Sequence, residues 1–439
     1  MIQIKKGLDL PIQGNPKNVI SESPRVTSCG ILGPDYIGMK PTMLVKEGDQ
    51  VLGGEALFED KKNPGNFFTS PTSGIVTAIN RGEQRRLLSV EIDLDGKNLN
   101  KQFNFSDDKS AQIEALTKSG QFNYFRTRPF NKIPSINSFP NEIFINACNS
   151  NPNSNDPFIY INQEQDLFDF GLKTLKNLYD CTIHVCYSHD DFQQNINSVN
   201  YHQFIGPHPS GLSGTHIHYI SPVNEKSKTW YLDAQGLLSI AHFFKHAEIR
   251  NHKYVSIGGP SIEEPKLIKT FIGSNCFELV AGNIKNDSRL ISGSVLHGFE
   301  ITSSIMFLGF YHNQISALPN TFQSTFMNWL RFGTNLHSKL GVFISNWIKP
   351  GQFNFNTALN GSNRGIVPIP AYDEVMPLNI MTIQLLKALV VKDFESAIQL
   401  GALELAPEDL ALCSYVCPSK YDFCSILDEN LEIIFNEIQ

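Results

Sequence analysis

The chain has 439 residues, of which 41% are apolar and 18% are charged, and its formal net charge is −7. These values are typical of a globular protein, and the length predicts two to four domains. No run of 18 apolar residues occurs, so we expect no membrane-spanning helix. The first residues lack the apolar centre of a signal peptide, and the eight scattered cysteines indicate reduced thiols in the cytoplasm.

The negative charge is concentrated near the C-terminus. Residues 366–439 hold 3 Lys/Arg and 12 Asp/Glu, a net charge of −9, so the remainder carries +2. We expect no nucleic-acid partner, because neutralising phosphates requires a basic surface. The acidic residues form either a solvated helical face or an interaction surface.

Residues 1–100 are predicted to form a β-rich domain. Short apolar runs between Leu44 and Val76 are separated by Gly-Asp, Gly-Gly and Pro-x-x-Gly turns. This pattern resembles the barrel-sandwich hybrid of biotinyl and lipoyl carriers, in which a lysine at a hairpin tip takes the prosthetic group. Asp60-Lys61-Lys62 is the nearest candidate, but Asn63-Pro64-Gly65 occupies the tip, so we expect an unmodified structural barrel.

Residues 101–255 alternate between strand and helix patterns. Glu142–Ala147 and Thr182–Cys186 are predicted strands, and the apolar spacing of Asp166–Leu178 between them predicts a helix. This alternation favours a Rossmann-like α/β domain with a largely parallel sheet. Neither strand is followed by Gly-x-Gly-x-x-Gly, so the sequence predicts no standard dinucleotide or flavin cradle.

Two further units are predicted, over residues 256–335 and 336–439. Short strands and Gly turns in the first favour a β-grasp module of the soluble-ligand-binding type. The second begins with a loop and continues into apolar residues at helical spacing over Ile380–Phe394 and Asp428–Ile438, which predict a helical C-terminus. The whole chain is thus expected to be multidomain, with both α+β and α/β parts.

Gly206–His218 is the most distinctive loop of the sequence. Its three glycines and two prolines predict a backbone that can approach a ligand closely. Its histidines, His208, His216 and His218, offer hydrogen-bond donors and acceptors or metal ligands near neutral pH. The alternative is a structured turn whose histidines bond to backbone carbonyls.

Two other groups of basic side chains invite a functional interpretation. His242 and His246 are spaced for one helix face, but a zinc protease needs Glu directly after the first histidine, where this chain has Phe243. We therefore exclude a zinc protease and expect no metal ligand. Arg126 and Arg128, separated by Thr127, either clamp an anionic group or form an ordinary surface pair.

Cys413-Ser414-Tyr415-Val416-Cys417-Pro418 matches the end of the ferredoxin pattern Cys-x2-Cys-x2-Cys-x3-Cys-Pro. Pro407 and Leu410 occupy the two preceding cysteine positions. Cys424 adds a third thiol, but a closed zinc or cluster site usually takes four. We expect Cys413 and Cys417 to be ordinary thiols on or beside a helical turn.

Five strings of this chain occur together in the order found in one family. The strings are Gly7–Gly14, Phe58–Gly65, Arg126–Phe130, Gly206–His218 and Cys413–Tyr421. On these the chain resembles the A subunits of bacterial Na+-translocating NADH:quinone oxidoreductases along essentially its whole length. That family is related to the cluster-bearing C subunit of Rnf complexes and to the flavin subunit of complex I.

The resemblance implies a subunit that has lost its cofactors. Arg126–Phe130 lies where the flavin loop of the relatives would be, and an arginine and proline segment cannot offer the backbone N–H nest of a phosphate loop. The implied complex is a translocase that oxidises NADH, reduces ubiquinone to ubiquinol and pumps Na+ out of the cell. This chain would be peripheral, on the cytoplasmic side of the inner membrane, and not catalytic alone. FMN, FAD and iron–sulfur centres would belong to the partner subunits.

The resemblance also implies a role in quinone binding, which is attributed to members of this family. The candidate quinone-binding residues are His208, His216, His218, Arg126 and Arg128, whose side chains can donate hydrogen bonds to quinone carbonyls beside an apolar cleft. No catalytic residue and no cofactor ligand is predicted. Two alternatives stay open: an assembly subunit without a ligand, and an Rnf-type electron-transfer subunit carrying an iron–sulfur cluster.

Overall fold

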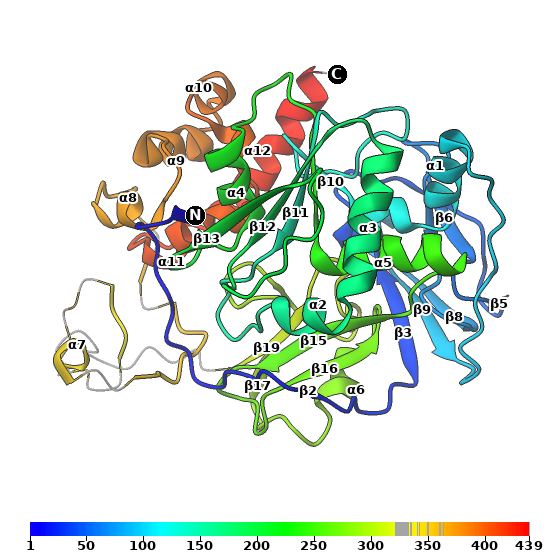
Figure 1. Ribbon diagram of the computed structural model, residues 1–439. Helices are drawn as coiled ribbons and strands as arrows, with labels where there is room; N and C mark the ends of the chain where they lie inside the picture. Colours follow the sequence, from blue (N-terminus) through cyan, green and yellow to red (C-terminus); the bar gives the residue numbers. More distant parts are fainter. Residues whose placement is uncertain are drawn as a thin grey trace.

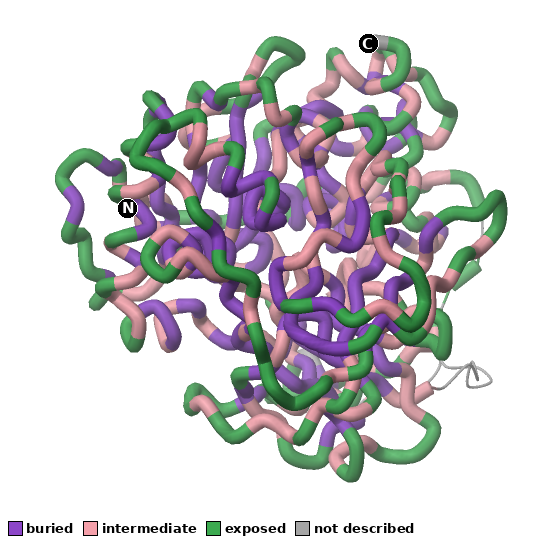
Figure 2. Tube along the Cα trace, turned by 90° about the vertical axis from the view of Figure 1, so that its right-hand side faces the viewer, coloured by how far each residue is buried: buried purple, intermediate pink, exposed green. Residues whose placement is uncertain are grey.

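The computed structural model describes residues 1–320, 333, 336–339, 341, 343–348, 351–359, 361–362 and 364–438. Within these residues the strands form two six-stranded sheets, one four-stranded sheet and one three-stranded sheet. Figure 1 shows an α/β unit at the centre, a barrel beside it, a second large sheet below, and helices of the C-terminal region packed at the upper left. Figure 2 shows that the most buried stretches of chain run through the interior of these units.

The N-terminal barrel consists of two small antiparallel sheets. The four-stranded sheet contains β3 (Ser28–Leu32), β9 (Leu87–Leu94), β8 (Gly74–Arg81) and β5 (Gln50–Val51), and the three-stranded sheet contains β4 (Pro41–Met43), β6 (Ala56–Asp60) and β7 (Phe67–Thr69). Phe58 of β6 and Phe68 of β7 are cross-strand partners in the three-stranded sheet, and their rings stack in the barrel core with centroids 4.7 Å apart. The predicted barrel-sandwich hybrid is confirmed, and Asn63-Pro64-Gly65 lies in the turn between β6 and β7.

The residues before Ser28 pair with other sheets rather than with the barrel. β1 (Ile2–Gln3) lies parallel to β13 (Asn200–Ile205), and β2 (Ile20–Ser21) lies parallel to β16 (Lys266–Phe271). Gly7 has φ +144°, and a Cβ there would meet the His208 carbonyl oxygen at 2.2 Å, so only glycine fits. The N-terminal segment is therefore a strap that joins the two six-stranded sheets.

The central α/β sheet has the strand order β1-β13-β12-β11-β14-β10. Its other strands are β10 (Arg126–Arg128), β11 (Glu142–Ala147), β12 (Thr182–Tyr187) and β14 (Thr229–Asp233). Only β10 is antiparallel to its neighbour. The strand predictions for 142–147 and 182–186 are confirmed, as is the largely parallel sheet.

Helices cover both faces of this sheet, as a parallel sheet requires. On one face Ile143 and Ile145 of β11 pack into the same core as α3 (Gln165–Leu178) and α5 (Ala234–His246). On the other face Phe144 packs with Ile217 of α4 (Ser213–Ile220). The helix predicted over 166–178 is thus confirmed. The remaining helices of this part are α1 (Lys109–Lys118) and α2 (Phe158–Gln163).

The second large sheet has the order β18-β17-β19-β15-β16-β2. Its own strands are β15 (His252–Gly258), β17 (Ser288–Ser292), β18 (Phe299–Glu300) and β19 (Gln314–Pro319), and it packs on α6 (Cys276–Val280). A mixed sheet holding one short helix agrees with the β-grasp prediction. Residues 321–332, 334 and 335 of the predicted module lie outside the described residues.

The C-terminus is helical, as predicted. It contains α8 (Ala371–Val375), α9 (Thr382–Val391), α10 (Phe394–Gln399), α11 (Ala411–Val416) and α12 (Phe423–Ile438). The single helix predicted over Ile380–Phe394 is wrong at its end. Lys392 adopts a left-handed conformation (φ +59°) that ends α9, and the Asp393 carboxylate then accepts from the backbone N–H of Ser396 to begin α10.

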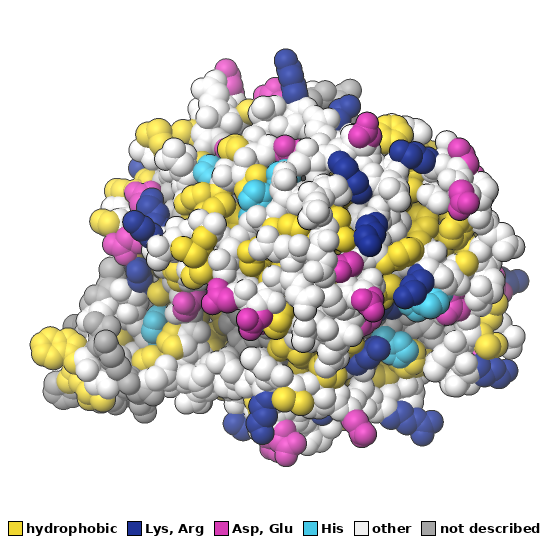
Figure 3. Space-filling view, viewed as in Figure 1, with side chains coloured by type: hydrophobic (Ala, Val, Ile, Leu, Met, Phe, Trp, Pro, Cys, Tyr) yellow, Lys and Arg dark blue, Asp and Glu magenta, His cyan; other side chains and the backbone are white. Residues whose placement is uncertain are grey.

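The surface carries single apolar side chains among interspersed charges on the face shown in Figure 3. The two most exposed large apolar side chains of the described residues are Met1 and Trp347, which are 84% and 86% exposed. Trp347 lies in α7 (Ser345–Ile348), a single turn that projects from the body in Figure 1. Among the described residues, no helix combines the length and apolar content that a membrane crossing needs.

Candidate functional site

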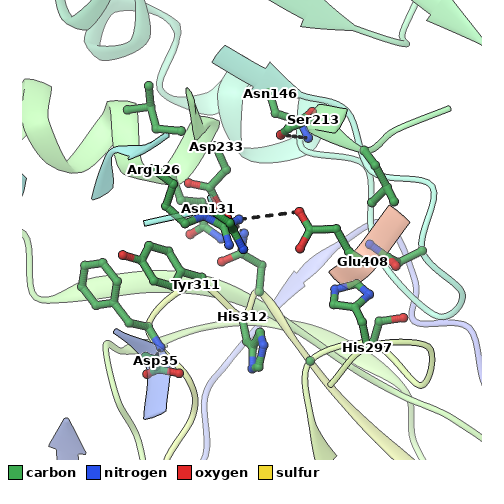
Figure 4. Close-up of a pocket in the computed structure, with 18 of the residues that line it drawn as sticks. Asp35, Arg126, Asn131, Asn146, Ser213, Asp233, His297, Tyr311, His312 and Glu408 are labelled. Carbon is green, nitrogen blue, oxygen red and sulfur yellow. Dashed lines mark hydrogen bonds and ion pairs between the residues drawn. The ribbon is translucent and has the colours of Figure 1, made fainter. Parts of the chain in front are cut away.

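A cavity of about 330 Å³ lies where the four predicted units meet (Figure 4). We call it the junction cavity. Asn146 at the end of β11 and Asp233 at the end of β14 are among its walls, so it lies at the carboxyl edge of the parallel strands, where α/β sheets bind ligands. The barrel, the α/β sheet, the second sheet and the helical C-terminus contribute, in turn, Asp35, Arg126 with Tyr231, His297 with Tyr311, and Glu408.

Arg126 is the central cation of the junction cavity. Strand β10 places its guanidinium carbon 4.9 Å from the ring centre of Tyr231 and 4.6 Å from that of Tyr311, so the cation stacks between two aromatic rings. Its Nη2 atom is 3.9 Å from the Glu408 Oε1 atom, which is too long for a hydrogen bond. The guanidinium is therefore positioned by stacking, and its N–H donors remain available to a ligand.

The cavity carries more carboxylates than cations. Its acidic side chains are Asp35, Asp233, Glu408 and Asp428, and its cations are Arg126 and Lys253. Burial raises the pKa of Asp35 to about 6 and lowers that of Lys253 to about 8. Burial also opposes ionisation of Glu408, but the nearby arginines outweigh it and hold the pKa of Glu408 below its usual value. A ligand bearing phosphates would meet net repulsion in such a cavity.

Most other polar side chains of the cavity wall are already paired. The Tyr311 hydroxyl donates to the Asn123 carbonyl at 2.7 Å, and His312 Nδ1 bonds to the Ser292 hydroxyl at 2.9 Å. His297 differs, because its Nδ1 atom is buried without a hydrogen-bond partner among the described residues. Burial lowers the pKa of His297, so this imidazole is neutral at pH 7.

Of the five predicted quinone-binding residues, only one lies at the junction cavity. Arg126 lines the junction cavity, and the other four are not among its walls. Arg128 is completely buried, with Nη2 3.3 Å from the Asp409 carboxylate and 3.7 Å from that of Glu408. Both arginines lie over the Tyr231 ring and near Glu408, but only Arg126 borders the cavity.

The three histidines of Gly206–His218 make contacts inside the chain. His208 Nδ1 is 3.0 Å from the Ser150 hydroxyl, and His216 Nε2 is 2.9 Å from the Ser210 carbonyl oxygen. His218 bonds to the Glu404 carboxylate at 2.7 Å through Nδ1 and accepts from the Asn379 N–H through Nε2. Burial lowers the pKa of both His208 and His216 to about 3.

The prediction of a loop over the whole of Gly206–His218 is wrong, because helix α4 begins at Ser213. The glycines do permit close approach, but to other parts of this chain. A Cβ at Gly206 would meet the Ile4 carbonyl oxygen at 2.2 Å, and one at Gly214 would meet the Asp409 carboxylate at 2.3 Å. These glycines let the N-terminal strap and the C-terminal region dock on the α/β sheet.

Part of the C-terminal acidic surplus forms this internal docking surface. Glu404, Glu408 and Asp409 pair with His218, Arg126 and Arg128 of the α/β unit. Sequence reasoning missed Glu408 and His297 as cavity residues. Glu408 is one of many acidic residues in 366–439, and His297 is followed by a glycine but lies in no recognisable motif.

The cysteines of the half motif are core residues. Cys413 and Cys417 are both 0% exposed in the helical core, on and just after α11, and burial raises the pKa of Cys413 far above its usual value. Cluster ligands are thiolates, so this environment disfavours iron–sulfur binding. Among the residues that the structure describes, no group of three or more His, Cys, Asp or Glu could hold a metal ion.

Family models match three successive parts of the chain. They are the NqrA N-terminal barrel-sandwich hybrid domain over residues 2–95, the NqrA second alpha/beta domain over 108–249, and the NQRA C-terminal domain over 254–303. A solved NAD+-reducing [NiFe]-hydrogenase overlaps 74% of this chain and 63% of its own at a TM-score of 0.40 and 10% identity. That value is too low to establish a shared fold.

Curated relatives match from end to end. Proteins named as the A subunit of the Na(+)-translocating NADH-quinone reductase are 43% identical in Hahella chejuensis, 42% in Neisseria meningitidis and 41% in Pasteurella multocida. Each comparison covers 100% of this chain and 100% of the relative. The chain therefore belongs to the family of A subunits of Na+-translocating NADH-quinone reductases.

Proposed function

We propose that this chain is the A subunit of a complex that oxidises NADH, reduces ubiquinone and transports Na+, and that it binds the quinone head group in the junction cavity. The chain is a peripheral subunit on the cytoplasmic side of the inner membrane. Its partners are the other subunits, which hold the flavins and iron–sulfur centres. End-to-end identity with relatives that carry this name supports the subunit role.

The observation that carries the ligand assignment is the position of Arg126. A quinone head group is flat and neutral, and it presents carbonyl oxygens that need hydrogen-bond donors. The junction cavity offers the aromatic side chains of Tyr231 and Tyr311 and the available N–H groups of Arg126 at one point. Within an otherwise largely polar wall, the rings offer a flat apolar surface and the guanidinium offers donors, the two features that a quinone head group needs.

A bound flavin or dinucleotide fits this cavity less well. Its phosphates would approach four carboxylates, and β10 ends in Arg128-Pro129 instead of a glycine-rich turn. Cys413 and Cys417, buried in the helical core, likewise disfavour the cluster-bearing alternative. The chain by itself is accordingly a quinone-binding and assembly subunit without a redox centre.

Calorimetric titration of the purified chain with a short-chain ubiquinone tests the assignment. We expect saturable binding, weakened about tenfold or more by Arg126→Ala, because a charge-assisted hydrogen bond contributes about 1.5–3 kcal/mol. Arg289→Ala is the matched control, since Arg289 pairs with Glu300 on the second sheet and is not among the cavity walls. Absence of binding by the unmodified chain would leave only the assembly role.

A visible-absorption spectrum tests the absence of a redox centre separately. We expect no flavin or iron–sulfur bands from the purified chain. Cluster bands with stoichiometric iron would overturn the cofactor-free assignment and favour an Rnf-type electron-transfer subunit.

A further inference from the structure

The free hydrogen-bonding groups of the junction cavity are mainly acceptors. Lys253 already donates to the Phe310 carbonyl at 2.8 Å, and Asp35 accepts from the Phe310 N–H at 2.7 Å. Asp233 accepts from the Gly236 N–H at 2.8 Å. Glu408 instead is held by long ion pairs, 3.9 Å from Arg126 and 3.7 Å from Arg128.

Figure 4 shows Arg126 and Glu408 facing one another across the cavity, with His297 next to Glu408. A ligand oxygen placed here meets a guanidinium on one side and a carboxylate on the other. Asp428, an exposed residue of the same wall, adds a second carboxylate. We call these three side chains the Arg126 corner of the cavity: Arg126 is a strong hydrogen-bond donor, and Glu408 and Asp428 are strong acceptors.

The two redox forms of a quinone differ in what they can offer to this corner. A quinone carbonyl oxygen only accepts hydrogen bonds, whereas a quinol hydroxyl both accepts and donates. An ionised carboxylate only accepts. A carbonyl beside Glu408 gives that carboxylate no hydrogen bond and leaves it only the long ion pairs, which is costly once water is displaced, while a hydroxyl accepts from Arg126 and donates to Glu408.

We infer that the junction cavity binds ubiquinol more tightly than ubiquinone, and that the Glu408 carboxylate is the specificity-determining group. Asp428 contributes to the same preference. The inference rests on the quinone assignment proposed above and adds the redox form that the site selects. A tenfold preference for the quinol would raise the two-electron potential of the bound couple by about 30 mV.

The decisive experiment compares both redox forms on the same protein. The purified full-length chain is titrated anaerobically with a short-chain ubiquinone and with its chemically reduced quinol. We expect the quinol to bind about tenfold more tightly or better, the effect of one hydrogen bond to a charged group. In Glu408→Gln, whose amide also donates to a carbonyl, the two affinities should agree within about twofold.

Two further variants separate this effect from changes in folding. Glu404→Gln alters a carboxylate that pairs with His218 outside the cavity, and it should keep the preference of the unmodified chain. Asp428→Asn alters an exposed side chain and should reduce the preference about threefold, half the effect of one good hydrogen bond in free energy. If Glu408→Gln does not fold, Asp428→Asn decides the question.

The outcomes distinguish this inference from the proposed function. Equal or tighter binding of the quinone by the unmodified chain overturns the preference and leaves quinone binding intact. Binding of neither form overturns the quinone assignment itself. A preference of unchanged size in both Glu408→Gln and Asp428→Asn rejects the two carboxylates as its source.

Discussion

Arg126 and Arg128 lie on one short strand, yet the two ends of β10 serve different purposes. Arg128 is 0% exposed and closes a contact between the α/β sheet and the helical C-terminus through Asp409. Arg126 stacks between two rings and faces Glu408 at 3.9 Å across a cavity. One short strand thus supplies both an interdomain ion pair and a cation that borders a cavity, and the two arginines differ in how closely a carboxylate approaches them.

Removal of the buried Arg128–Asp409 ion pair should cause the greatest loss in the free energy of unfolding. Arg128→Ala leaves the buried Asp409 carboxylate without its cation, and loss of one partner of a buried pair costs about 3–5 kcal/mol. We expect the helical C-terminus to unfold at lower urea concentration, as followed by circular dichroism. Arg289→Ala, which removes a partly exposed pair with Glu300, should change the free energy of unfolding by at most about 1 kcal/mol. Equal effects of the two variants would show that the Arg128–Asp409 pair does not stabilise the docked C-terminus.

A second loss of stability is expected when the pH falls, because the buried His216 imidazole is neutral in the folded chain. The folded-state pKa of His216 is lowered to about 3, below its unfolded value near 6.5, so the unfolded chain binds more protons between these values. Stability is therefore fully present above about pH 6.5 and falls as the pH drops. Between pH 7 and pH 5.5 we expect a loss of about 1–2 kcal/mol from this residue.

Denaturant titrations at both pH values measure that loss. His216→Asn should flatten the pH dependence of the unfolding free energy relative to the unmodified chain. An unaltered slope in His216→Asn would contradict the assignment of the pH effect to this imidazole.

Arg126, on the cavity side, should contribute less to stability than Arg128. Arg126→Ala removes two cation–π contacts and one long ion pair, so we expect a loss of about 1–2 kcal/mol in unfolding free energy. Thermal unfolding compared with Arg128→Ala measures the difference. If Arg126→Ala proves as destabilising as Arg128→Ala, the distinction between a cavity-lining and a structural arginine fails.

Much of the fold could be predicted because its signals are local. The strands at 142–147 and 182–187 and the helix at 165–178 follow from runs of apolar residues with a period of 2 or 3.6, and neighbouring residues alone produce these patterns. Glycine and proline turns likewise predicted the barrel. The end of α9 at Lys392 escaped prediction, because a lysine in a left-handed conformation carries no distinctive sequence signal.

The candidate site was predictable only in part. The two arginines of the Arg126–Phe130 segment mark Arg126 as a candidate, and it lines the cavity. The other four candidates instead make hydrogen bonds or ion pairs with residues of this chain. His216 was expected as a ligand donor and bonds instead to the Ser210 carbonyl, which the sequence had left open as the alternative. A residue type shows what a side chain can bond to, whereas its actual partner depends on the surrounding fold.

Local patterns in the chain suffice to predict the barrel, the α/β unit and the helical C-terminus, and they show Pro407 and Leu410 where the ferredoxin pattern has cysteines. The meeting of Arg126 with Glu408, and of His297 with Tyr311 at the same cavity, is visible only in the folded chain. These residues come from separate units that dock through Arg128, Asp409 and Gly214. Their meeting depends on that docking, because no periodicity connects positions hundreds of residues apart.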